Sequence, residues 1–334
     1  MSRLWEPGAV TGVGSLPGTD PAEAATLVVG ELPLLPHVPE MPARGPGASM
    51  IGRAAALLVD LPAEVVPTGW RVATHPGRDL RRARDLLAWD LDAIEAAATD
   101  LIGPLKVQVT GPWTLAATLE LANGTAVVSD HGATRDLAES LAEGARAHLA
   151  EITRRLPAVT PVLQLDEPAL PSVLAGRVPT ASGWQTLRAV ERSVVRDTLA
   201  SVLAVAREGA RVVHCCASDV PIALFREVTA DAISLDLSLI NGALNDQLGE
   251  AVDAGTSLWL GVLPSTDAAV SFDAARARLT GFWDELGFPR VQLADAVVPT
   301  PACGLAGASP AYARRALAVL RDLGRWLTET AGEG

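Results

Sequence analysis

Short runs rich in Val, Ile and Leu alternate with long Ala- and Arg-rich helical stretches along the whole chain. This alternation predicts parallel βαβ units, in which helices cover the faces of a sheet. Strands are expected at 9–15, 32–38, 105–110, 162–166, 211–216, 233–236, 258–263 and 291–294. Helices are expected at 20–30, 50–60, 79–99, 112–122, 133–155, 186–207, 219–228, 242–253, 272–286 and 309–331. The number of strands indicates an α/β fold closed into a single (β/α)8 TIM barrel.

No linker rich in Gly, Ser or charge divides the sequence, so we expect one domain over residues 1–334. The Pro- and Gly-dense stretch 35–47 is interpreted as a long loop after the second strand. The formal net charge of -12 argues against nucleic acid or an anionic membrane as a partner. The N-terminus lacks the apolar region of a signal peptide, and no apolar run approaches the ~20 residues of a membrane helix. A cytoplasmic protein is therefore expected.

The three cysteines, Cys215, Cys216 and Cys303, are a small and odd-numbered set in a long chain, which argues against a disulfide framework and favours metal binding or catalysis. Because side chains alternate along a strand, His214 and Cys216 should point to one side and Cys215 to the helix layer, as a small buried hydrophobe. Cys303 follows the eighth expected strand. All these positions belong to the end of a barrel where active sites form. A His/Cys/Cys set there suits tetrahedral zinc with one exchangeable position.

Carboxylates also follow the expected strands. Asp236 ends the sixth strand and is expected either to be a fourth, displaceable zinc ligand or to orient His214. Asp166 and Glu167 end the fourth strand on opposite faces. We assign Asp166 to the active site, where it binds a cationic group such as the ammonium of an amino acid, and Glu167 to structure. Ser15 follows the first strand at the same end of the barrel.

Six segments, in order along nearly the whole chain, resemble the catalytic C-terminal domain of cobalamin-independent methionine synthase, within the superfamily that includes uroporphyrinogen decarboxylase. They are Gly-Val-Gly-Ser-Leu-Pro (12–17), Thr-Gly-Pro-Trp-Thr (110–114), Gln-Leu-Asp-Glu-Pro-Ala-Leu (164–170), His-Cys-Cys (214–216), 232–238 and Pro-Ala-Cys-Gly-Leu (301–305). The resemblance implies a zinc ion held by His214, Cys216 and Cys303, with Asp236 at the place of a glutamate. It also implies that Ser15 and Asp166 bind homocysteine, with backbone N–H groups near Gly14.

The resemblance implies a zinc-dependent S-methyltransferase that converts homocysteine to methionine, with a methyltetrahydrofolate or a methylated corrinoid protein as donor. Several departures leave the donor open. The family's N-terminal barrel is absent, Asp236 is shorter than the family's glutamate, Ser172 replaces another glutamate, and residues 260–264 lack the family's histidine. We also place no match for the family's second homocysteine-binding carboxylate.

Two other functions stay open. The chain could be a corrinoid-dependent methyltransferase for another thiol, such as a coenzyme M analogue, which needs the zinc set but not the amino-acid-binding carboxylate. It could also be a non-catalytic zinc- or thiol-binding homologue, which the absent histidine favours. A decarboxylase of the uroporphyrinogen type has no use for these zinc ligands.

Overall fold

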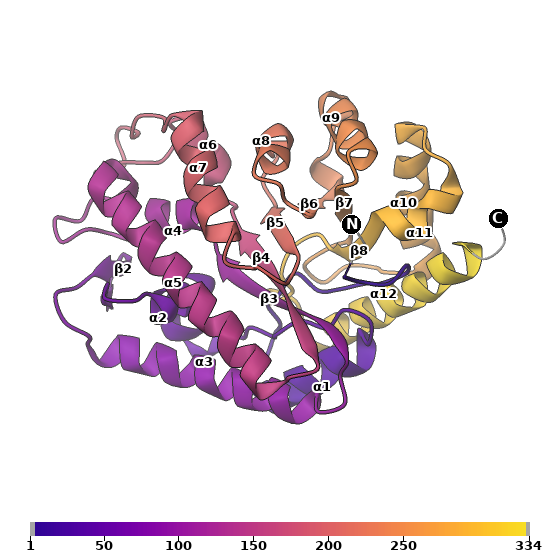
Figure 1. Ribbon diagram of the computed structural model, residues 1–334, viewed down its shortest axis with the longest axis horizontal. Helices are drawn as coiled ribbons and strands as arrows, with labels where there is room; N and C mark the ends of the chain where they lie inside the picture. The colour runs from indigo at the N-terminus through magenta and orange to yellow at the C-terminus, as the bar shows by residue number, and fades with distance from the viewer. Residues whose placement is uncertain (1–3, 332–334) are drawn as a thin grey trace.

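The computed structural model describes residues 4–331, in which strands and helices alternate (Figure 1). The strands are β1 (Ala63–Val66), β2 (Gly69–Val72), β3 (Gly103–Thr110), β4 (Val159–Asp166), β5 (Arg211–Cys215), β6 (Ala232–Asp236), β7 (Ser257–Leu263) and β8 (Val297–Pro301). The α-helices are α1 (Pro21–Glu31), α2 (Met50–Leu57), α3 (Arg78–Ala97), α4 (Pro112–Thr118), α5 (His131–Arg155), α6 (Leu170–Leu174), α7 (Arg192–Leu203), α8 (Ile222–Glu227), α9 (Gly242–Asp253), α10 (Phe272–Leu286), α11 (Leu293–Ala296) and α12 (Pro310–Ala331). Among these described helices, none combines the length and the apolar character needed to cross a membrane.

Strands β3 to β8 form one curled parallel sheet, in which each strand lies beside the next one along the chain. Helices surround this sheet on its outer side (Figure 1). The predicted α/β class with a parallel sheet is thus confirmed. Strands β1 and β2 form a separate antiparallel hairpin between α2 and α3, which the sequence analysis did not predict.

The first two predicted strands, 9–15 and 32–38, form no regular ladder in the described part of the chain. Prolines at 33, 36 and 39 lack the N–H donor that a ladder needs, and glycines at 12 and 14 weaken a strand. Single backbone hydrogen bonds still join both segments to the edges of the sheet. The donor–acceptor pairs are Thr11 N–Pro299 O (3.3 Å), Lys106 N–Pro36 O (2.8 Å) and Val38 N–Lys106 O (3.0 Å). The regular sheet is therefore a half-barrel of six strands.

The prediction of a last strand at 291–294 was wrong. Arg290–Gln292 is a 3₁₀ turn, Leu293–Ala296 is helix α11, and the strand is β8, at Val297–Pro301. A short apolar run does not distinguish strand from helix by periodicity. The sequence of β8 also contains prolines at 299 and 301, which is not typical of a strand because proline is rare inside sheets.

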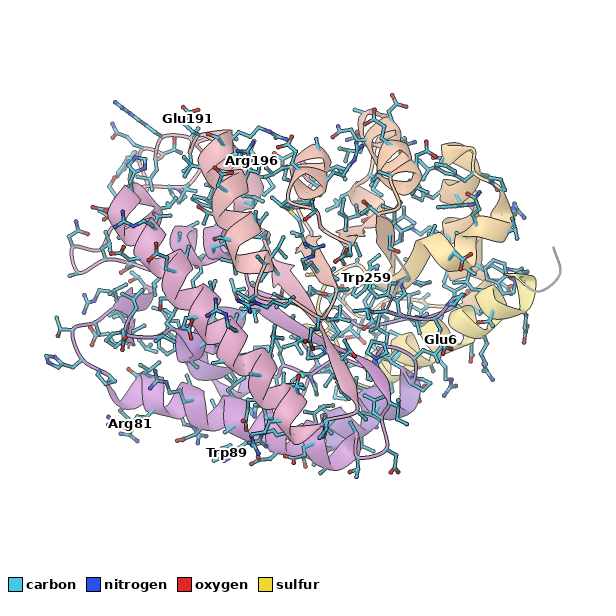
Figure 2. All side chains as sticks on the ribbon, in the orientation of Figure 1. Glu6, Arg81, Trp89, Glu191, Arg196 and Trp259 are labelled. Carbon is cyan, nitrogen blue, oxygen red and sulfur yellow. The ribbon has the colours of Figure 1, made fainter. Side chains whose placement is uncertain are left out.

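Two apolar clusters pack against the two faces of the sheet. An outer cluster joins the strands to the helices and includes Val213 and Ile233. The second cluster, here called the inner apolar cluster, lies on the opposite face. It comprises Trp5, Ala9, Leu35, Val162, Ala210, Val212, Ala232, Trp259 and Val298. Trp5 and Trp259 pack edge to face with ring centroids 5.2 Å apart, and Trp259 lies in the middle of the molecule (Figure 2).

Candidate metal centre and thiol site

Three possible metal ligands meet where β5 and β8 end. His214 lies on β5, Cys216 directly follows it, and Cys303 lies in the loop after β8. One ligand atom from each residue lies within 4.8 Å of the other two. The two sulfur atoms are 3.5 Å apart. The structure thus brings together the three side chains that the sequence analysis grouped.

Alternation along β5 explains why Cys215 is not part of this group. Val212 belongs to the inner apolar cluster, while Val213 and Cys215 belong to the outer one. The prediction that Cys215 is a buried hydrophobe facing the helices is therefore confirmed. Burial raises the pKa of the Cys215 thiol to about 12, which keeps it protonated and unreactive.

The neighbouring strand orients the imidazole of His214. Its Nδ1 lies 2.9 Å from Oγ of Ser234, the residue opposite it on β6. Its Nε2 is buried and has no hydrogen-bond partner among the described residues. An unpartnered buried nitrogen costs free energy, and a ring held at one nitrogen can bind a metal through the other. Ser234 was not predicted from the sequence, where its one signal is a hydroxyl within an apolar strand.

The two cysteine thiols at this site differ in their electrostatics. The hydrogen bond between the sulfurs, aided by His214, lowers the pKa of Cys303 to about 4 against the effect of burial. The same hydrogen bond, together with burial, raises the pKa of Cys216 far above its usual range. The pair of thiols therefore loses its first proton more readily than an isolated thiol. Metals bind thiolates rather than thiols, so one ligand of the set is already in the binding form.

Asp236 lies outside the group of three. Its Oδ1 accepts hydrogen bonds from the backbone N and the Oγ of Ser238, at 2.8 and 2.7 Å. In the part of the chain that the structure describes, the clustered ligand atoms do not include an Asp236 oxygen. Nor is Asp236 the residue that orients His214, because Ser234 holds that nitrogen. A role as displaceable ligand stays a prediction.

Asp166 and Glu167 diverge at the end of β4, as alternation requires. Asp166 lies opposite His214 in the sheet register, and its Oδ1 accepts a hydrogen bond of 2.7 Å from Gln164. Burial raises the pKa of Asp166 to about 7, although His214 opposes the shift. Glu167 instead accepts hydrogen bonds from the backbone N–H groups of Trp113 and Thr114, at the start of α4. These contacts agree with a structural role for Glu167.

Ser15 and Gly14 lie beside the loop that carries Cys303. Backbone N of Leu305 donates to Ser15 O at 2.7 Å. A Cβ placed on Gly304 would lie only 2.1 Å from Ser15 Oγ, so a larger residue at that position would displace the Ser15 hydroxyl. The segment expected to bind substrate therefore packs directly against the candidate metal site.

Glu40 lies beside the candidate site and was not predicted from the sequence. It is buried, and its backbone N donates to Gly14 O at 3.2 Å. Its side chain accepts from Arg53 Nε at 3.2 Å, and Arg53 also pairs with the buried Asp90. The only signal in the sequence was a single carboxylate in a Pro-rich stretch interpreted as a loop.

Comparisons with known proteins give one family match and similar folds among solved structures. The family model described as the catalytic domain of cobalamin-independent synthase matches residues 9–325. No curated protein sequence matches the chain with significant similarity. Among solved structures, a B12-independent methionine synthase from Shewanella sp. W3-18-1, in complex with selenomethionine, superposes with a TM-score of 0.61. The two chains are 16% identical, and the match covers 98% of each, which supports a common fold.

Proposed function

The chain belongs to the cobalamin-independent methionine synthase catalytic-domain family, and on that premise we propose that it methylates the sulfur of homocysteine to give methionine. The observation that carries the proposal is the convergence of His214, Cys216 and Cys303 within 4.8 Å of one another. This set lies beside Ser15 and Asp166, which could bind the amino-acid end of the substrate. A metal held by sulfur and imidazole ligands can bind a thiol, and the neighbouring polar side chains can bind the ammonium and carboxylate groups. Together they suit an amino acid that carries a thiol.

The donor set fits zinc. Two sulfurs and one imidazole nitrogen are the ligands that catalytic zinc sites use, with another position left for substrate. His214 would bind through Nε2, since Nδ1 is engaged by Ser234. Zinc, when bound, supplies a cation that keeps a coordinated thiol deprotonated at neutral pH.

The amino-acid end of homocysteine requires partners of both charges. Asp166 would accept hydrogen bonds from the ammonium group, while Ser15 Oγ and the backbone near Gly14 would donate to the carboxylate. Gln164 holds the Asp166 carboxylate in place. A charge-assisted hydrogen bond of this kind contributes roughly 1.5–3 kcal/mol.

Family membership favours a methyltetrahydrofolate as the methyl donor, and the comparisons give no support to a methylated corrinoid protein. In this reaction the donor's N–CH₃ bond breaks, an S–CH₃ bond forms, and the thiol proton ends on the folate nitrogen. Residues 260–264 still lack the histidine expected near this proton, and Ser172 still replaces a glutamate on the folate side. These two departures keep the second candidate function open, a zinc- or thiol-binding homologue without activity.

We propose further that residues 9–16 and 35–40 take the places of the first two strands and complete a (β/α)8 barrel in one domain. Support comes from their backbone hydrogen bonds to β3 and β8, at opposite edges of the sheet. The family match, which runs from residue 9 to residue 325 without a break, is consistent with one domain.

An assay with zinc-loaded protein, homocysteine and 5-methyltetrahydrofolate tests the function directly. Mass spectrometry should detect methionine that grows with time and with enzyme concentration, and the Cys303→Ser variant should produce none. Polyglutamylated folate and methylcobalamin serve as alternative donors. Binding of homocysteine without turnover by any donor would favour the binding homologue. Absence of homocysteine binding would refute the proposal.

A further inference from the structure

Lys106, on β3, is a fully buried lysine on the inner face of the sheet. Its side chain has no exposed surface, and its Nζ donates to Val13 O at 2.6 Å and to Gln108 Oε1 at 3.2 Å. Burial lowers the pKa of Lys106 to about 7, against the attraction of Asp166 and Glu40. Lysine is almost never fully buried, since removing its charge from water is costly. Such a residue is expected to have a function that outweighs this cost.

The carbonyl of Val13 is the point where this lysine meets the candidate substrate site. Gln164 Nε2 donates to the same oxygen, at 2.9 Å, and also to Asp166 Oδ1, at 2.7 Å. Val13 directly precedes Gly14 and Ser15. One hydrogen-bonded group therefore links the residues proposed to bind the substrate carboxylate to the residue proposed to bind its ammonium.

The charges around the pocket explain why a cation is needed there. Asp166 and Glu40 are both buried carboxylates close to Lys106. Arg53 forms an ion pair with Glu40 and is shared with Asp90. Without Lys106 the pocket would hold an uncompensated anion, which attracts an ammonium group but repels a carboxylate. Homocysteine carries both groups.

We propose that Lys106 is a positioning residue that makes the pocket selective for a zwitterionic amino-acid thiol over a simple cationic one. It holds the Val13 carbonyl, which fixes Gly14 and Ser15, and its charge lets the pocket accept a carboxylate near Asp166. This inference rests on the proposed function, because it concerns the amino-acid end of the same substrate.

A purely structural role predicts a different outcome. Removing one partner of a buried charged group leaves the others uncompensated and destabilises the fold. Lys106→Met should therefore lower the melting temperature whichever role the lysine has, so stability alone does not distinguish the two roles. If Lys106 only supported the fold, the variant that remains folded would bind all thiols with equally reduced affinity.

The test compares homocysteine with cysteamine, an aminothiol that has no carboxylate, by calorimetric titration of zinc-loaded protein. In Lys106→Met the Kd for homocysteine should rise by about 10-fold or more, the loss of a charge-assisted interaction. The Kd for cysteamine should stay the same or fall. Zinc content, measured separately, should not change. Ser257→Ala is the matched control, because this buried hydroxyl on β7 has no partner in the described residues, and it should change neither Kd.

Equal weakening of both thiols, or no change in either, would overturn the role of Lys106 while leaving homocysteine as substrate. Failure of the wild-type protein to bind homocysteine would overturn the proposed function, and this inference with it. Lys106→Gln, which keeps a donor but removes the charge, gives the same comparison if the methionine variant does not fold. It should show the same loss of preference for homocysteine over cysteamine.

Discussion

The inner face of the sheet is apolar near the amino ends of the strands and polar near their carboxyl ends. Val162, Val212 and Ala232 belong to the inner apolar cluster. Two residues further along the same strands lie the buried polar residues Gln164, His214 and Ser234. Buried apolar surface stabilises the fold at about 25 cal/mol per Å², whereas a buried polar group costs free energy unless it is bonded. Each of these strands thus contributes to stability at one position and to the candidate site at the next inward position.

Buried polar atoms without a partner in the described residues occur in both regions, but their chemistry differs. In the apolar region they are the hydroxyl of Ser257 and the indole nitrogens of Trp5 and Trp259, and the indoles only donate hydrogen bonds and cannot bind a cation. In the polar region they include Nε2 of His214 and Oε1 of Gln164, which can accept. Among the described residues, the polar region is therefore the one where a nitrogen that can accept belongs to a cluster of possible metal ligands.

The largest expected effect is the loss of metal from the polar region without loss of the fold. Cys303→Ser or Cys216→Ser should remove most of the zinc, which is expected at about one ion per chain in protein prepared without chelator. The reason is that each sulfur is one of the three possible ligand atoms clustered among the described residues. Metal analysis of the purified variants measures this effect. Cys215→Ser, in the outer cluster, is the control and should retain zinc.

Removal of zinc by a chelator should abolish thiol binding but leave the far-UV circular dichroism and the melting temperature nearly unchanged. The ligands come from distant parts of a domain with its own large core, unlike a small zinc finger that folds only around metal. Unfolding on chelation would instead show that the metal bound in the polar region is needed for the stability of the fold.

The second prediction concerns the apolar region. Trp259 is fully buried and packs against Trp5. Trp259→Ala should lower the free energy of unfolding by about 3–5 kcal/mol, because it leaves a large cavity. Urea unfolding followed by circular dichroism measures the loss. Folded protein should still contain zinc. If Trp259→Ala lost zinc while its free energy of unfolding stayed the same, Trp259 would contribute to the metal site rather than to stability. That result would contradict the division of the inner face into a stabilising apolar region and a polar region that forms the candidate site.

The third prediction concerns binding of the ammonium group by Asp166. Asp166→Asn should weaken homocysteine binding about 10- to 100-fold, the loss of a charge-assisted hydrogen bond. Calorimetry with mercaptoethanesulfonate, a thiol without an amino group, is the control and should show little change. Zinc content should also be retained. If both thiols weaken equally, or neither does, Asp166 is structural and the homocysteine assignment loses its main support outside the metal ligands.

The sequence predicted the fold best where long periodic segments bury one face. The five strands β3 to β7 and the long helices such as α5 and α12 lie close to their expected places. The prediction failed where proline and glycine interrupt the backbone. Segments 9–15 and 32–38 make isolated bridges instead of ladders, and β8 contains two prolines. In these places tertiary contacts decide the structure, and they leave no local pattern.

The clustering of His214, Cys216 and Cys303 was predictable from the sequence, but the groups around them were not. His214 and Cys216 are two residues apart, so strand alternation alone puts them on one side. Ser234 and Lys106 form hydrogen bonds with partners on other segments, namely His214 and Val13. Such partners depend on the register between strands, which a single sequence does not show.

The smallest expected effect comes from Ser234, which tests whether the polar region is organised beyond its ligands. Its hydroxyl lies 2.9 Å from His214 Nδ1 and fixes the ring orientation. Groups that hold a metal-binding histidine typically contribute 10- to 100-fold to metal affinity. For a neutral hydroxyl we expect the lower end, so Ser234→Ala should weaken zinc binding by about 10-fold. Competition with a chromophoric chelator measures this affinity. Ser238→Ala is the matched control, because its hydroxyl bonds Asp236 and not His214. An equal loss in Ser238→Ala would instead indicate that Asp236 helps to bind the metal, as the sequence analysis allowed.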